Sequence, residues 1–283
     1  MGRTKPIGTM GPGLRAAGFV SLAGIVAVNA MGVVDHDTES GMGCGAHWPL
    51  CHGALVPAFS NQSVIIEYVH RLLTLGFTIA LVVFLVDALR RYHTKRSWKY
   101  MSWSLIALLL IETAICTAGV LWTVPNAIMS WLMPVGLAAQ ALLWVMVRQG
   151  DGGPSAVRSA VTFRVAALAL FGYLYLGAWI SYAGPGTLAR GFMIGSGVLL
   201  ALIGLYWIVR DWQSGISITR LVWPVLAAPF VVQFSRSTVA GDLAVFAWLS
   251  WMTAIVAVRF ADGLGKPGDA AVTLALVRDA SQA

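Results

Sequence analysis

Residues 62–88 read QSVIIEYVHRLLTLGFTIALVVFLVDA. A membrane-spanning helix needs roughly 20 mostly apolar residues. This stretch is longer, and no side chain between Leu72 and Val86 carries a charge. Inside a bilayer the backbone N–H and C=O groups must be hydrogen-bonded within the segment itself, which a helix achieves. The stretch therefore predicts a helix that crosses a membrane.

The rest of the chain has the same apolar character. Of its 283 residues, 58% are hydrophobic and 11% are charged, whereas a soluble domain carries about 25% charged residues. This composition excludes an ordinary soluble protein, a disordered tail and a nucleic-acid-binding module. It predicts an all-α protein in the lipid bilayer, with eight transmembrane helices at 14–34, 62–88, 100–123, 126–148, 162–182, 190–210, 219–239 and 242–261.

The net charge of +7 is explained by topology and needs no acidic partner. Lys and Arg accumulate in the cytoplasmic loops of membrane proteins. All 19 basic residues except Arg71, Arg190 and Arg236 fall on one side of the predicted spans. We therefore expect a multi-pass protein of the cell membrane, with both termini cytoplasmic and a long outer loop at 35–61. A signal peptide at the first span is the alternative, but its cleavage would remove one of the eight spans.

The loop-like stretch at 149–155 divides the spans into two groups of four. Residues 1–150 form the first group, and residues 151–283 form the second group with a short tail. Weak internal similarity follows the same order in both, for example Gly32-Val-Val and Gly177-Ala-Trp near the ends of corresponding spans. A repeat with an even number of spans keeps its orientation. We expect two similar four-helix bundles, with shared helix composition as the alternative explanation.

Histidine and cysteine point to the outer loop. All five histidines lie within the first 93 residues, and two of them fall in GCGAHWPLCHG at 43–53, beside Cys44 and Cys51. A cysteine pair on the oxidising side of a membrane favours a disulfide, of which a redox-active thiol pair is the functional form. A Zn or Cu site that includes His47 and His52, and unpaired thiols, are the alternatives.

Three ionisable residues of the opening stretch share one helical turn, Glu67-Tyr-Val-His70-Arg71. Positions i, i+3 and i+4 lie on one face of a helix, so the three side chains project together. Ionisable groups within a span are costly and usually face a bundle interior or a water-filled cavity. One interpretation is a hydrogen-bonded cluster that fixes helix packing. The other is a heme or proton site, with His70 as axial ligand, Arg71 facing a propionate and Glu67 moving a proton.

The span at 100–123 holds two further residues of interest. Glu112, near the middle of the membrane, is either a protonated packing residue or a member of a proton relay. Cys116 is expected to be a small buried apolar residue.

These motifs resemble those of the heme A synthase family of cytochrome oxidase assembly proteins. The similarity lies in TESGMGCGAHWPLC at 38–51 and in IEYVHR at 66–71. The family has eight spans in two similar halves and an outer cysteine pair. The resemblance implies an oxidoreductase that converts a methyl group of heme O to the formyl group of heme A. It also implies three partners: heme, the farnesyltransferase that forms heme O, and cytochrome oxidase subunits.

The resemblance carries over to individual positions. His70 matches one of the paired histidines that address the iron of the substrate heme. Trp131 stands where the span at 126–148 would supply the second histidine, beside the open coordination position. The implied catalytic residues are Glu67, Cys44 and Cys51, and the implied heme-binding residues are His70, Arg71 and Trp131.

The chain departs from the family in its second half. Trp248 occupies the place of a histidine in the last span, and Arg190-Gly-Phe-Met193 replaces the second Glu-x-x-His-Arg motif. The second half therefore cannot hold a heme b cofactor through two histidines. The thioethers of Met193 and Met252 are the remaining, weaker candidates as ligands.

Two other functions stay open. One is a non-catalytic heme-binding or oxidase-assembly membrane protein derived from the family. The other is a membrane protein that oxidises thiols through Cys44 and Cys51. Such an enzyme usually needs a second cysteine pair to pass electrons on, and only Cys116 remains.

Overall fold

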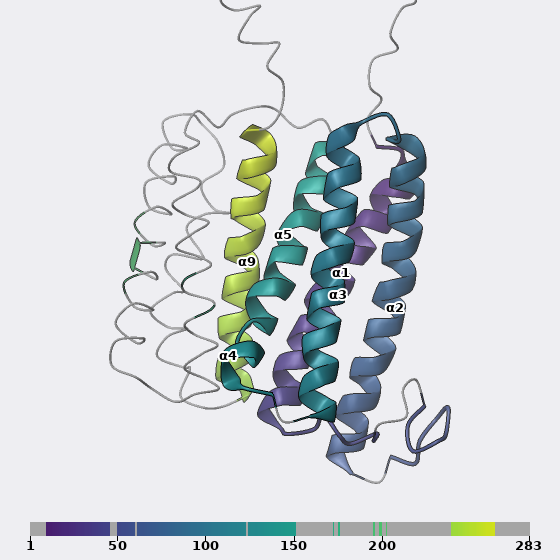
Figure 1. The fold of residues 1–283 in the computed structure, drawn as a ribbon, viewed down its shortest axis with the longest axis vertical. Helices are drawn as coiled ribbons and strands as arrows, with labels where there is room; N and C mark the ends of the chain where they lie inside the picture. Colours follow the sequence, from purple (N-terminus) through teal and green to yellow (C-terminus); the bar gives the residue numbers. More distant parts are fainter. Residues whose placement is uncertain are drawn as a thin grey trace, which may run out of the picture.

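The computed structural model is helical throughout the part of the chain that it describes. That part comprises residues 10–45, 50–59, 61–122, 124–150 and 239–263, with a few positions between 172 and 202. Its helices are α1 (Pro12–Asp37), α2 (Gln62–Arg91), α3 (Arg96–Leu121), α4 (Asn126–Met129), α5 (Leu132–Gly150) and α9 (Val239–Gly263), as Figure 1 shows. Five segments in this part are long and apolar enough to cross a membrane.

All five predicted spans that fall on described residues are confirmed. Those at 14–34, 62–88, 100–123 and 242–261 correspond to α1, α2, α3 and α9, and the one at 126–148 corresponds to the apolar segment Ala127–Gln149, which contains α5. The spans predicted at 162–182, 190–210 and 219–239 fall on residues that the structure does not describe, apart from isolated positions.

The predicted span at 126–148 is interrupted near its start, between α4 and α5. Pro134 explains the break, because proline has no N–H to donate to the carbonyl four residues earlier and its ring crowds that carbonyl. That carbonyl belongs to Ser130, which lies in the turn between the two helices. In this turn the N–H of Trp131 donates to the carbonyl oxygen of Ile128, three residues earlier, at 3.1 Å. An α-helix would bond to the carbonyl four residues earlier, so the turn is tighter than a helical one.

The described helices run up and down between two ends. Arg90 and Arg91 lie in the last turn of α2, and Arg148 lies in the last turn of α5. Both helices finish at the end of the bundle where α1 begins, opposite the loop that joins α1 to α2 (Figure 1). These basic residues therefore share one end, as the charge pattern predicted. That this end is cytoplasmic stays a prediction.

Helix α1 is central to the bundle, and it packs against α2, α5 and α9. Small residues permit close approach between membrane helices. A methyl group on Gly18 would come within 2.7 Å of Val147 Cγ2, and one on Gly24 would come within 3.1 Å of the Phe77 side chain. The face of α2 away from this contact exposes large apolar side chains, as a lipid-facing surface does, among them Ile79, Val82, Val83 and Val86.

A buried polar contact joins α5 to α9. The Gln140 side-chain amide donates to Ser250 Oγ at 2.8 Å and to the Ser250 carbonyl oxygen at 3.2 Å. Gln140 and Ser250 are both buried, at 1% and 7% exposure. Leu137 on α5 and Leu249 on α9 belong to one apolar cluster at the same interface. The hydrogen bonds therefore fix the register of α9 on α5.

We expect Gln140→Leu and Ser250→Ala each to destabilise the protein, because Gln140→Leu removes both hydrogen bonds and Ser250→Ala removes the one to Oγ. Polar contacts between membrane helices couple by roughly 0.6 kcal/mol on average and up to about 1.7 kcal/mol. Unfolding of the single and double variants in mixed detergent micelles measures this coupling. Strictly additive effects would show that Gln140 and Ser250 do not interact.

Candidate functional site

The outer end of α2 begins with a defined cap. Asn61, in extended conformation, accepts a hydrogen bond from the Val64 N–H at 2.9 Å through its side-chain oxygen. This satisfies one of the free N–H groups of the first turn. The cap fixes the start of the helix, and so places Glu67, His70 and Arg71 in its second and third turns.

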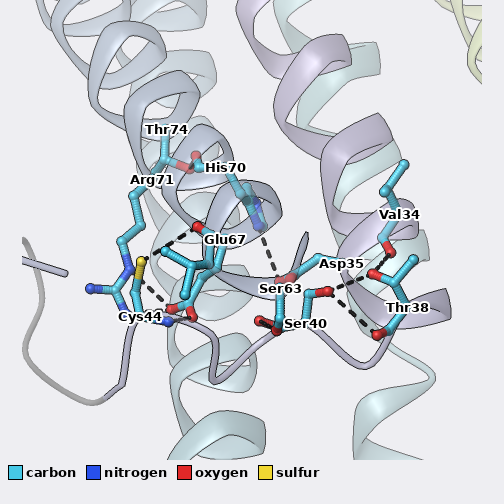
Figure 2. Close-up of polar contacts among 11 residues, drawn as sticks. Val34, Asp35, Thr38, Ser40, Cys44, Ser63, Glu67, His70, Arg71 and Thr74 are labelled. Carbon is cyan, nitrogen blue, oxygen red and sulfur yellow. Dashed lines mark hydrogen bonds and ion pairs between the residues drawn. The ribbon is translucent and has the colours of Figure 1, made fainter. Parts of the chain in front are cut away.

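Glu67 and Arg71 form a buried ion pair that holds the outer loop. Their side chains are 8% and 11% exposed, and the Arg71 Nε donates to Glu67 Oε1 at 3.0 Å. Arg71 also donates to the carbonyl oxygens of Gly45 and Leu50, at 2.6 Å each. The second Glu67 oxygen accepts the N–H of Cys44 at 2.5 Å. The pair thus binds the backbone of the loop at three points, and Figure 2 shows Cys44 against Glu67 and Arg71.

Cys44 and Cys51 form a disulfide, with sulfur atoms 2.02 Å apart. Both residues are fully buried and pack against Val64 of α2. The sequence left a disulfide, a metal site and unpaired thiols open, and the structure confirms the disulfide. Two sulfurs bonded to each other cannot serve as thiolate ligands, so these cysteines do not form the suggested Zn or Cu site. The Nε2 of His52 lies 2.7 Å from the Gly43 carbonyl oxygen.

His70 lies on the same turn but faces α1. Its Nδ1 lies 3.4 Å from Asp35 Oδ2, and the two side chains are 19% and 16% exposed. The expected joint projection of Glu67, His70 and Arg71 is therefore divided. Glu67 and Arg71 contact the disulfide loop, whereas His70 crosses to Asp35 in the last turn of α1 (Figure 2).

Glu112 lies against α1 and α5, inside the bundle. A methyl group on Gly136 would come within 2.5 Å of Glu112 Oε1 and within 3.0 Å of the Asn29 amide nitrogen. That nitrogen is buried, with no hydrogen-bond partner in the described part of the chain. Gly136 thus leaves room for two polar side chains from α3 and α1. This contact agrees with a packing role and also with a proton-relay role for Glu112.

Trp131 lies in the turn between α4 and α5. Its ring centroid is 4.8 Å from that of Tyr175, with the planes tilted by 50°. The residue is 40% exposed. The first half of the chain therefore meets the second half at this position.

The comparisons with known proteins agree with the motifs. No family model matches the chain. It is 28% identical to the heme A synthase of an Exiguobacterium species, over 63% of this chain and 60% of the relative. It is 30% identical to that of Halalkalibacterium halodurans, over 63% and 62%, and 26% identical to that of Alkalihalophilus pseudofirmus, over 68% and 67%. The chain is a divergent relative of the heme A synthases. The first two matches span about three-fifths of each relative's length.

In this heme A synthase relative, the described part of the second half offers an apolar core at the positions suggested for heme ligands. Trp248 and Met252 are 6% and 4% exposed and lie in a cluster with Val33, Leu137 and Phe246. The Met252 side chain is a core residue there. Met193, the other suggested thioether ligand, is outside the described residues.

The sequence did not point to Asp35 as part of the site. It falls at the boundary between the first predicted span and the outer loop, and the apolar pattern assigns it to the loop. The structure extends α1 to Asp37 and so places Asp35 in its last turn. The available signal was spacing: Asp35 follows Gly32 by three positions, so both share a face of the helix.

We expect Arg71→Gln to release the disulfide loop, because it removes charge-assisted hydrogen bonds worth about 1.5–3 kcal/mol each. The Cys44–Cys51 disulfide should then be reduced roughly tenfold faster or more by a water-soluble thiol. Arg71→Lys should also release it, since one ammonium cannot reproduce the planar fork of donors. Reduction is followed by alkylation and mass spectrometry of the folded protein.

Arg91→Gln is the matched control, because Arg91 pairs with Asp87 at the exposed far end of the same helix. It should leave the reduction rate unchanged. An unchanged rate in Arg71→Gln would show that the ion pair does not hold the loop.

Proposed function

We propose that the protein binds heme O in the outer part of its first helical half and oxidises a methyl group of that heme to a formyl group. The relatives named heme A synthase support the pathway. One observation carries the site: the half-buried imidazole of His70, whose Nδ1 faces Asp35. That arrangement leaves Nε2 as the nitrogen that can bind iron.

Arg71 is proposed to contact a heme propionate with the donor that remains to it. A guanidinium carries five N–H donors in a fixed plane. The Nε–H and both Nη2 hydrogens are directed to Glu67 and Gly45, and one Nη1 hydrogen is directed to Leu50. Among the described residues no contact engages the other Nη1 hydrogen, which is proposed to donate to a carboxylate oxygen. Propionate binding and loop binding by Arg71 are therefore compatible.

Glu67, Cys44 and Cys51 support this site mainly by holding the loop in place. Glu67 accepts hydrogen bonds from Arg71 and from the Cys44 N–H. Proton transfer by Glu67, which the sequence motif suggested, would require it to leave these partners and stays a prediction.

We propose that the chain holds no second heme. No histidine follows His93, and the described side chains Trp248 and Met252 are buried in an apolar cluster. Oxidation of a methyl to a formyl group releases four electrons and four protons when water supplies the oxygen. We therefore propose that a partner protein accepts these electrons. Two further proposed partners are neighbours in the pathway: the farnesyltransferase that makes heme O, and the oxidase subunits.

A non-catalytic heme carrier for oxidase assembly is the second candidate. Trp131, rather than a histidine, stands at the position implied for the second ligand, and it packs on Tyr175. Such a protein would bind heme O through His70 and release it unchanged. Catalysis and carriage thus share one binding site and differ in the product.

Thiol oxidation through Cys44 and Cys51 is less well supported. Disulfide exchange requires a thiolate to reach one of the sulfurs, and both cysteines are fully buried beneath the loop. The remaining cysteine, Cys116, lies in α3 as a free thiol and is exposed, so the expectation that it is buried was wrong.

We propose that the protein resides in the cell membrane with both termini cytoplasmic, so that the disulfide loop lies outside. Two four-helix halves, residues 1–150 and 151–283, complete the proposed architecture. The heme site would then open toward the outer face of the membrane.

We expect His70→Ala to lose bound heme by at least about tenfold, because the iron loses its protein ligand. Wild type and variant are co-expressed with a heme O-forming farnesyltransferase, purified in detergent and analysed for heme content and type. His93→Ala is the matched control, since His93 lies exposed in the link between α2 and α3 and contacts the Arg90 carbonyl. Wild type that is colourless when purified from heme-replete cells would contradict the proposal.

The product separates the two candidates. Formation of heme A by wild type supports the synthase, whereas bound heme O that is never converted supports the carrier. Retention of full heme content by His70→Ala would place the heme elsewhere.

A further inference from the structure

The outer end of α1 presents two residues to His70. Gly32 lies beneath the imidazole, since a methyl group on Gly32 would come within 3.8 Å of His70 Cε1. Asp35 lies one turn farther along the same face, with Oδ2 at 3.4 Å from His70 Nδ1. The imidazole ring therefore lies against α1, with its Nδ1 beside Asp35.

The placement of Asp35 is costly unless it interacts with a donor. Both side chains are less than one-fifth exposed, and a buried carboxylate without a partner is strongly destabilising. Asp35 Oδ1 is buried with no hydrogen-bond partner in the part of the chain that the structure describes. Among the described residues, the contact of Oδ2 with His70 is what offsets the cost of burying the Asp35 carboxylate.

The chemistry of iron-binding histidines gives this contact a function. A ligating imidazole usually donates its other ring N–H to a carboxylate or a carbonyl oxygen. That bond selects the tautomer, fixes the ring orientation and raises the basicity of the ligating nitrogen. A carboxylate that accepts the Nδ1–H leaves Nε2 as the nitrogen without a proton.

We propose that Asp35 is the positioning residue of the heme ligand: it accepts the Nδ1–H of His70 and thereby presents Nε2 to the iron of the substrate heme. Only the part of this inference that concerns the heme iron rests on the proposed function. The Asp35–His70 hydrogen bond and the tautomer that it selects belong to the heme-free protein as well.

The first test uses the heme-free full-length protein in detergent, labelled with nitrogen-15 at histidine. The spectra are recorded at alkaline pH, and the His70 signals are assigned with His70→Gln. Wild type should show the Nδ1–H tautomer. Asp35→Leu, which removes the acceptor, should shift His70 toward the Nε2–H form that free histidine prefers. An unchanged tautomer in Asp35→Leu would overturn the proposal.

The second test uses protein loaded with heme O. Asp35→Asn should retain a histidine-ligated heme but bind it about 10–100-fold more weakly. In the five-coordinate ferrous state its iron–histidine stretching frequency should fall, because the imidazole loses anionic character. Asp35→Glu keeps a carboxylate, so its heme affinity and its iron–histidine stretching frequency should lie between those of Asp35→Asn and wild type. Asp87→Asn is the control, as it removes the same charge from an exposed site that pairs with Arg91.

The two tests separate this inference from the proposed function. A shifted tautomer in Asp35→Leu together with full heme retention in His70→Ala would support the Asp35 contact and reject His70 as the ligand. Loss of heme in His70→Ala with an unchanged iron–histidine frequency in Asp35→Asn would keep the ligand and overturn the positioning role. Asp35→Asn serves for the tautomer measurement if Asp35→Leu does not fold.

Discussion

The buried ion pair of Glu67 with Arg71 is the interaction on which the outer site depends. Removing two charges from water costs several kcal/mol per ion, and only good geometry with further hydrogen bonds offsets that cost. Here the further bonds go to the backbone of the loop, at Cys44, Gly45 and Leu50. The loop is therefore part of the charge compensation, and the disulfide limits how far it can move. The turn of α2 from Glu67 to Arg71 therefore holds the loop between α1 and α2 in place.

The same turn sets the direction of His70. The Glu67 and Arg71 side chains contact the loop. His70, on the same turn, faces α1 instead, where it lies beside Gly32 and Asp35. Small residues along α1 let α2 come close enough for this contact, as at Gly24 against Phe77. Helix packing in the apolar core thus determines which nitrogen of an imidazole is available near the outer surface. This links ordinary packing to the chemistry proposed for the heme ligand.

Features set by local pattern could be predicted from the sequence, whereas contacts between helices mostly could not. Apolar length predicted α1, α2, α3 and α9, and i, i+3, i+4 spacing predicted the turn that carries Glu67 and Arg71. The break before α5 was also encoded, at Pro134, although the length of the apolar run concealed it. Cys44 and Cys51 left three alternatives, since spacing does not reveal which atoms meet. The partners Asp35 and Ser250 were missed because hydropathy does not record which faces of two helices come together.

We propose that the chain binds a single substrate heme, through one histidine, and holds no second heme. A pyridine-hemochrome spectrum of the purified wild-type protein, with heme and protein quantified together, gives both the heme type and the number of hemes per chain. We expect about one heme per chain, of the O or A type, with an optical spectrum of a heme ligated by one histidine. Two hemes per chain, or a bis-histidine heme b, would contradict it.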